Sequence, residues 1–182
     1  AIFLIPLIAA GLIVLIPRTI RWGIRVVALM ATFVTMVLGV ILFCKYGNAE
    51  AIDGYKFTYF AHWVSLDLSV SKLFINYHVG VDGINLGLVV MGSIVAFAAT
   101  CLSKEINKFE KEYYFLLMIM TGGILGAFVS LDLFFFYFFH ELALVPTFIM
   151  IGVWGRGLDR NYATFKITIY LSVGALLALV GL

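Results

Sequence analysis

Charged side chains are scarce in this sequence of 182 residues: Asp, Glu, Lys and Arg together make up 12% of it, whereas 64% is hydrophobic. A water-soluble domain of this length could not bury that much apolar surface, which excludes the soluble globular class. The net charge of +2 is spread over short polar segments between apolar runs, so there is neither a basic stripe for nucleic acid nor an acidic tail. The mean hydropathy of +1.11 is that of a membrane protein.

Cysteine is also rare, and its two positions argue against a metal centre. Cys44 and Cys101 lack CxxC or Cys/His ligand spacing, so neither a zinc site nor an iron–sulfur site is indicated. His62 and His78 match no metal-ligand spacing either, and we interpret them as ordinary exposed or hydrogen-bonding histidines. We therefore expect no metal and no cofactor in this chain.

Six apolar runs are candidates for spanning helices, each of which needs roughly 20 apolar residues. Pro17 stops the first run, and Asp132 marks a tight turn between the fourth and the fifth. The chain begins at Ala1 without a methionine and stops at Leu182 without a polar flank, which we interpret as a fragment. The pattern predicts an all-α polytopic membrane protein, with 1–182 forming a single transmembrane domain fragment whose spans are 1–16, 26–44, 84–102, 113–131, 133–154 and 162–182.

Basic residues orient the predicted bundle, because short cytoplasmic loops are enriched in Lys and Arg. Three alternate loops hold most of the twelve basic residues, namely Arg18, Arg21, Arg25, Lys104, Lys108, Lys111, Arg156 and Arg160. This places the amino end outside and returns Leu182 to the same side.

The long external loop at 45–83 contains an alternation of apolar and polar residues. Val64, Leu66, Leu68 and Val70 alternate with polar residues, which predicts a strand, and 73–79 could pair with it as a hairpin over the outer ends of the helices.

The candidates for chemistry are ionisable residues inside apolar runs. Glu141 lies about eight residues into the fifth run, hence near the bilayer midplane. An ionised acid there costs roughly 2.5 to 3.5 kcal/mol, so such a residue usually faces the bundle interior or a hydrated cavity and carries protons or ions. The alternative is a protonated carboxyl that hydrogen-bonds a neighbouring helix. His140 points about 100° away, and is either a proton-relay group or an interhelical hydrogen-bonding residue.

Lys166 lies about five residues, or 7 Å, into the sixth run. Two interpretations stay open: the side chain snorkels outward, or it passes protons from the cytoplasm towards Glu141. Pro146 removes a backbone donor and frees the carbonyl of Leu142, so we expect a kink close to Glu141. The predicted site therefore comprises Glu141, Lys166 and His140 on a proton pathway.

Three segments carry a family resemblance: HVGVDGINL at 78–86, SLDLFFFYFFHELALVPTFIMIGVWG at 130–155 and RNYATFKITIY at 160–170. In order and spacing they resemble signatures of the antiporter-like chain M family of proton-pumping NADH:quinone oxidoreductase, respiratory complex I, and the likeness covers about 79–182. It implies a fold of about fourteen helices, with two inverted five-helix repeats. The chain would then be an N-terminal fragment of such a subunit.

The resemblance also implies roles. The family's key glutamate falls on Glu141, and its usual partner, a lysine on a broken seventh helix, lies beyond Leu182. His140 departs from the family pattern, which often has an aromatic or apolar residue there. NADH, FMN, iron–sulfur clusters and quinone are expected in partner subunits, and the partners are other membrane subunits of complex I, neighbouring antiporter-like subunits and the lipid bilayer. A bacterial inner membrane is the preferred location.

Two other functions stay open from the sequence. Subunits of multisubunit sodium/proton antiporters and membrane-bound hydrogenases share the helical core and the glutamate. A non-transporting scaffold is the third possibility, and it would leave Glu141 and Lys166 as costly residues without a purpose.

Overall fold

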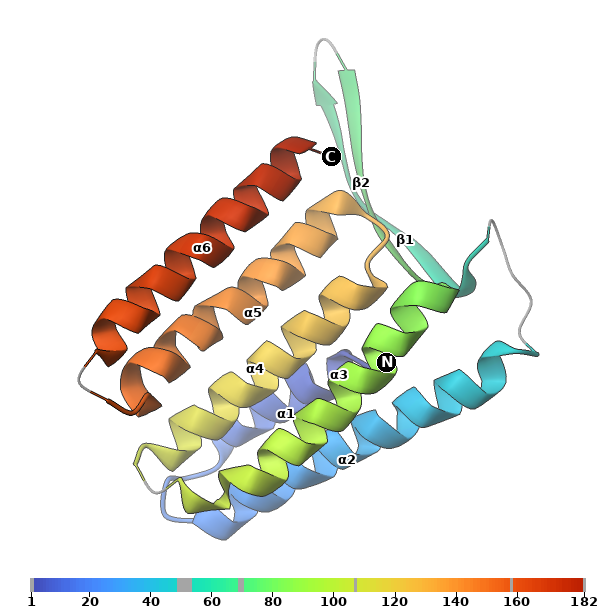
Figure 1. The fold of residues 1–182 in the computed structure, drawn as a ribbon. Coiled ribbons are helices and arrows are strands. Elements are labelled where there is room, and N and C mark those ends of the chain that lie inside the picture. Colours follow the sequence, from blue (N-terminus) through green and yellow to red (C-terminus); the bar gives the residue numbers. More distant parts are fainter. Residues whose placement is uncertain (1, 49–53, 69–70, 107, 158, 182) are drawn as a thin grey trace.

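A computed structural model describes residues 2–48, 54–68, 71–106, 108–157 and 159–181, and the side chains of these except at 63–68 and 71–75. The chain is a helical bundle from which one antiparallel hairpin projects (Figure 1). The elements, in chain order, are α1 (Leu4–Leu15), α2 (Arg21–Tyr46), β1 (Lys56–Leu68), β2 (Ser71–Val81), α3 (Gly83–Leu102), the 3-10 turn η1 (Ser103–Glu105), α4 (Glu110–Val129), α5 (Leu133–Trp154) and α6 (Arg160–Gly181).

Five of the described helices, α2 to α6, are long and apolar enough to cross a membrane, which agrees with a polytopic membrane protein. The sequence predicted six spans. The helix of the first predicted span, α1, has only 12 residues. At 1.5 Å per residue it measures about 18 Å, which is short of the ~30 Å hydrocarbon core. The structure thus supports five of the six spans.

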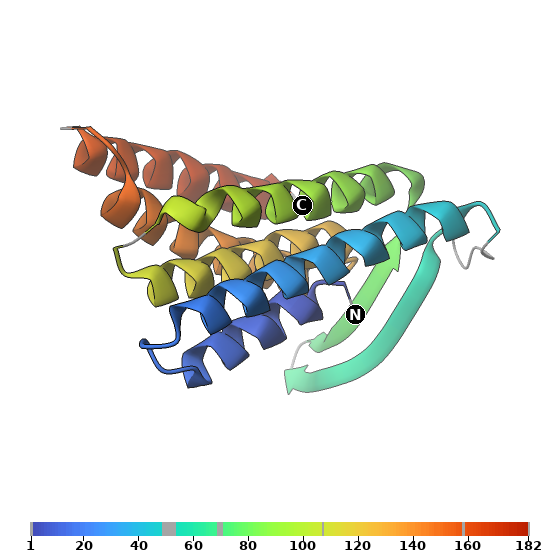
Figure 2. The ribbon, with the colours of Figure 1, turned by 90° about the horizontal axis from the view of Figure 1, so that it is seen from below.

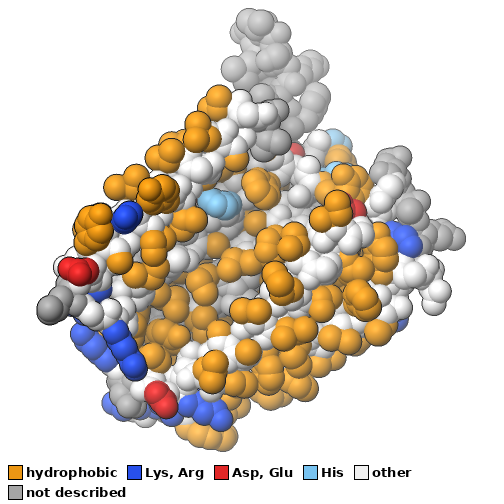
Figure 3. All heavy atoms as spheres, in the orientation of Figure 1, with side chains coloured by type: hydrophobic (Ala, Val, Ile, Leu, Met, Phe, Trp, Pro, Cys, Tyr) orange, Lys and Arg blue, Asp and Glu red, His pale blue; other side chains and the backbone are white. Residues whose placement is uncertain are grey.

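The helices run between two ends of the bundle that differ in chemistry. The hairpin and the α4–α5 connection lie at the hairpin end, and the connections α1–α2, α3–α4 and α5–α6 lie at the opposite, basic end (Figure 1). Figure 3 shows Lys and Arg side chains gathered at the basic end. The three loops that the sequence predicted to be basic therefore share one end of the molecule.

Three helices begin earlier at the basic end than the sequence predicted, and one of them is α6, which begins at Arg160 rather than at residue 162. α2 begins at Arg21 rather than at residue 26, and α4 begins at Glu110 rather than at residue 113. Arg25 and Lys111 are thus helical residues, not loop residues. Hydropathy places the end of a span at the first charged residue. The helix itself can extend further, because Arg, Lys and Glu are good helix formers and the helix dipole favours acidic residues in a first turn.

The hairpin is held against the bundle near its base. β1 and β2 pair antiparallel with irregularities between Lys56 and Tyr59 and between His62 and Val64. β2 also bridges to the α4–α5 connection, where the Leu131 amide donates to the His78 carbonyl at 2.9 Å. Beyond this base the strands run side by side away from the end of α2 (Figure 2). The hairpin therefore fixes the connection that begins α5.

α4 is the central helix of the bundle. One buried cluster joins it to α1 and α2 through Ala9, Ala28 and Met118, and another joins it to β2, α3 and α5 through Leu125 and Phe139. α6 is peripheral, because Thr164 is its one buried residue among those described. α5 thus has one side against α4 and the other towards α6 (Figure 1).

Candidate functional site

Glycines of α4 fix the rotation of α5. A Cβ added at Gly123 would lie 2.9 Å from both the Ala143 nitrogen and the Phe139 oxygen, and one at Gly126 would lie 2.6 Å from the Phe139 ring. Small residues at such a contact let two membrane helices approach closely. Phe139 therefore points into α4. Because successive helical residues turn by about 100°, Glu141 lies about 200° around, on the side of α5 that faces away from α4.

The predicted carboxylate lies in the middle of α5. Glu141 is half-buried, and eight residues from the start of the helix place it about 12 Å along its axis. Tyr137 precedes it by one turn on the same face of α5, so the phenol and the carboxylate are neighbours on the helix surface. This pairing was not anticipated from the sequence, where Tyr137 was hidden within a run of phenylalanines. The i, i+4 spacing of a phenol and an acid was the available signal.

The helix runs on through the proline that follows. Pro146 is buried inside α5, and the helix continues to Trp154. One residue later, the Thr147 hydroxyl donates to the Ala143 carbonyl at 2.9 Å, next to the Leu142 carbonyl that the proline frees. α5 therefore presents Glu141 and His140 on one continuous helix.

His140 faces a cavity between α5 and α6. The cavity measures about 250 Å³ and is lined mainly by apolar surface, with Tyr137, His140 and Tyr170 among its lining residues. The Nδ1 atom of His140 is buried and has no hydrogen-bond partner among the described residues. The Phe136 ring lies beside the imidazole at a centroid distance of 6.5 Å. His140 is therefore a residue of the cavity wall.

Lys166 lies apart from Glu141. Its side chain is exposed, and its ammonium lies 5.5 Å from the ring centre of Tyr162, one turn nearer the basic end. The ring centroids of Phe148 in α5 and Phe165 in α6 are 5.9 Å apart, so these two residues lie at the same height along the bundle. Glu141 is seven residues from Phe148, so Lys166 and Glu141 are separated by about 10 Å along the bundle. The structure brings Glu141 and His140 together on α5 and leaves Lys166 towards the basic end.

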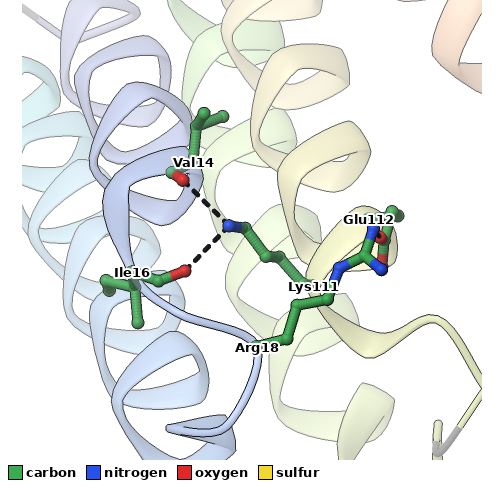
Figure 4. A network of polar contacts seen from close by, with 5 residues as sticks. All are labelled: Val14, Ile16, Arg18, Lys111 and Glu112. Carbon is green, nitrogen blue, oxygen red and sulfur yellow. Dashed lines mark hydrogen bonds and ion pairs between the residues drawn. The ribbon is translucent and has the colours of Figure 1, made fainter.

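Two ion pairs join α4 to the α1–α2 region in the part of the chain that the structure describes. Arg25 pairs with Glu110, whose side chain is only 4% exposed, and Arg18 pairs with Glu112 on the surface. The ammonium of Lys111 donates to the carbonyls of Val14 and Ile16, both at 2.8 Å, at the end of α1 (Figure 4). Sequence reasoning used these basic residues only for topology. The pairing depends on which helices are neighbours, and no local sequence signal gives that.

Histidines at the hairpin end pack against an aromatic ring. His62 and His78 lie with ring centroids 5.0 and 5.5 Å from that of Phe60. Among the residues that the structure describes, no three His, Cys, Asp or Glu side chains gather to hold a metal ion. The ionisable residues inside the helices therefore remain the candidate site.

These features define the class: a multi-pass helical membrane protein with a half-buried carboxylate in the middle of one apolar helix, α5. The sequence profile of the family described as NADH:quinone oxidoreductase/Mrp antiporter, TM matches residues 130–182, which cover α5 and α6. The resemblance to antiporter-like complex I subunits is confirmed by this match and by curated relatives.

The chain is 30% identical to NADH-quinone oxidoreductase subunit M of Rhodobacter capsulatus over 186 residues, an alignment that covers 98% of this chain and 33% of the relative. It is 38% identical to F(420)H(2) dehydrogenase subunit M of Methanosarcina mazei over 109 residues, with 59% of this chain and 22% of that protein covered. The chain thus spans about a third or less of the length of these relatives.

The fold also matches a solved structure. A chain of respiratory complex I from Thermus thermophilus with bound NADH superposes with a TM-score of 0.72 at 21% identity, over 96% of this chain and 33% of that one. The overall fold of this chain is therefore one that a chain of that respiratory complex also adopts.

Proposed function

We propose that this chain is part of a proton-translocating membrane subunit of NADH:quinone oxidoreductase, which converts free energy from quinone reduction in partner subunits into proton movement. The observation that carries the proposal is Glu141, a half-buried carboxylate in the middle of an apolar helix, turned away from the packed α4 interface. Such a residue is costly in a bilayer unless it carries protons or ions. The curated relatives named NADH-quinone oxidoreductase subunit M support the proposal.

The proposed pathway begins at the basic end. Short loops rich in Lys and Arg face the cytoplasm, so this end lies inside and the hairpin end outside a bacterial inner membrane, with the amino end outside. Protons enter near Lys166 and reach Glu141 over about 10 Å of hydrated polar groups. A lysine on a helix beyond Leu182 completes the acid–lysine pair. The charge on Glu141 then gates the proton electrostatically, because opposite charges nearby favour the ionised form.

The partners follow from this role. Other membrane subunits of the complex, including neighbouring antiporter-like subunits, adjoin the chain in the bilayer. NADH, FMN, iron–sulfur clusters and quinone belong to partner subunits, and this chain supplies no redox centre of its own.

A sodium/proton antiporter or membrane-bound hydrogenase subunit is the second candidate, because the matching family profile is described for both NADH:quinone oxidoreductase and Mrp antiporters. Companion subunits separate the two functions. Flavin and iron–sulfur partners that purify with the protein support the redox pump, and their absence from an otherwise active complex supports an antiporter.

The test measures quinone reduction and membrane acidification together in the intact complex that carries Glu141→Gln, with assembly checked separately. Loss of both pumping and coupled turnover in an assembled complex is the expected result. Glu112→Gln is the matched control, because Glu112 carries the same acid on the surface at the basic end. If the Glu141→Gln complex pumps protons normally, the Glu141 carboxylate has only a structural role and the proposed mechanism is wrong.

A further inference from the structure

Two helices contact α4 at neighbouring glycines. A Cβ added at Gly122 would lie 2.6 Å from the Leu7 side chain and 3.2 Å from the Phe3 carbonyl oxygen, so α1 lies directly on this residue. The next residue, Gly123, lies equally close to the backbone of α5. Small residues of this kind let membrane helices approach closely. α1 and α5 therefore both contact α4 at the same height along the bundle.

The ring of Phe139 fills the space that a third glycine leaves. A Cβ added at Gly126 would lie 2.6, 2.7 and 2.9 Å from three atoms of this ring, Cδ1, Cγ and Cε1. We call this hollow over Gly126 the glycine notch. The ring of Phe3, at the start of α1, packs edge-on against Phe139 at a centroid distance of 5.2 Å, an arrangement that aromatic pairs prefer. Both phenylalanines are buried, so the Phe139 ring is held between α4 and Phe3.

A larger residue in the notch would move α5 itself. The close contacts include Cγ, the ring atom nearest the backbone, and Phe3 lies against the ring as well, so the ring cannot simply swing aside. The contact would have to open from 2.6 Å to an ordinary 3.4 Å or more, a movement of about 0.8 Å. Because the interior is closely packed, the helix has to carry most of that movement.

Movement at Phe139 is passed to Glu141 through the helix. The two residues are separated by about 3 Å along the axis of α5 and by about 200° around it. Their side chains extend to a similar radius, roughly 5 Å from the axis. Whether α5 turns or shifts as a body, a movement of about 0.8 Å at Phe139 therefore moves the Glu141 carboxylate by about the same distance. A misplacement of about 1 Å at a reacting group can slow a reaction by about 10²-fold.

We propose that Phe139, seated in the glycine notch, is a positioning residue that sets the rotation of α5 and so fixes where the Glu141 carboxylate stands. Gly126 of α4 and Phe3 at the start of α1 hold the Phe139 ring in place. This inference rests on the proposed function of Glu141. It makes α1 and α4 part of the proton-transfer site, because their contacts with Phe139 decide which way α5 presents its carboxylate.

The test measures proton pumping per assembled complex in sealed vesicles. Gly126→Ala places a Cβ against the Phe139 ring, and pumping should slow at least about tenfold. Gly152→Ala is the matched control, because it makes the same substitution within α5, where the new Cβ would meet only the Thr164 side chain at an ordinary 3.6 Å. This control should pump at the wild-type rate.

Phe139→Leu completes a double-mutant cycle. This variant alone leaves the notch partly empty and should also slow pumping. The double variant Gly126→Ala, Phe139→Leu refills the notch, because one side chain gains a carbon where the other loses several, and it should pump faster than either single variant. If Gly126→Ala alone does not assemble, the comparison of the double variant with Phe139→Leu decides. A double variant that pumps no faster than Phe139→Leu, or that fails to assemble, overturns the inference.

A chemical readout separates positioning from stability. Dicyclohexylcarbodiimide reacts with carboxyl groups in the apolar part of a membrane, and mass spectrometry measures how fast it labels Glu141. The labelling rate in assembled complexes should change in Gly126→Ala and return towards the wild-type rate in the double variant. Normal pumping or an unchanged labelling rate in an assembled Gly126→Ala complex overturns the inference while Glu141→Gln still abolishes pumping. Normal pumping in Glu141→Gln instead removes the proposed function itself.

Discussion

Replacing Arg25 by Gln should destabilise the bundle far more than replacing Arg18, although both arginines pair with glutamates of the first turn of α4. The side chains of Glu110 and Arg25 are 4% and 30% exposed. Arg25→Gln therefore leaves the Glu110 carboxylate buried without a cationic partner. Breaking a buried ion pair costs about 3–5 kcal/mol, and the partial exposure of Arg25 places the expected loss near about 3 kcal/mol.

The surface pair supplies the comparison. Arg18 and Glu112 have side chains that are 77% and 36% exposed, and exposed ion pairs contribute about 0–1 kcal/mol. Arg18→Gln should therefore cost less than about 1 kcal/mol. The double variant Arg25→Gln, Glu110→Gln should recover most of the loss, because no unpaired charge remains buried.

The assay is denaturant unfolding of the purified full-length subunit in detergent micelles, followed by tryptophan fluorescence. The free energy of unfolding is compared across the single variants, the double variant and the unaltered protein. Losses below about 1 kcal/mol for both Arg25→Gln and Arg18→Gln, or a double variant no more stable than Arg25→Gln, would refute the reasoning from burial.

Three further predictions concern the helix contact, the helix cap and the hairpin. Gly123→Ala should cost about 1–3 kcal/mol in the same unfolding assay, because its Cβ would lie 2.9 Å from backbone atoms of α5, whereas Gly174→Ala, with nothing within 4 Å, should cost nothing. Asp132→Ala should cost about 1 kcal/mol because the Asp132 carboxylate caps α5, and Asp132→Asn should not, since Asn caps equally well; equal losses would contradict the cap. Burial, and then the neighbouring Tyr59, raise the pKa of Tyr77 above its ordinary 10.0, so ultraviolet titration should show Tyr77 ionising at higher pH than free tyrosine does. The stability that Tyr77 contributes is complete below its ordinary pKa and is lost as pH rises through the raised one, a loss that Tyr77→Phe removes.

Sequence reasoning placed the candidate residues Glu141 and His140 on one predicted span but did not identify the residues around them. Glu141 and His140 were identified because ionisable residues are conspicuous in an apolar run, and the structure places both on α5. Tyr137 was missed, because a tyrosine among phenylalanines looks like a packing residue until the structure places it in the wall of the cavity beside His140. Lys166 was left between two interpretations, and the structure places its ammonium over the ring of Tyr162, nearer the basic end.

The sequence by itself determined the membrane class, the helical segments and the shared end of the three basic loops, because hydropathy and charge report directly on the cost of leaving water. Only the tertiary structure decided how α5 is rotated against Gly123 and Gly126, how Arg25 finds Glu110, and where the cavity beside His140 opens. The reason is physical. Lipid tails and the bundle interior are equally apolar, so hydropathy cannot tell which face of a helix meets a neighbour, and close packing of small residues makes that choice.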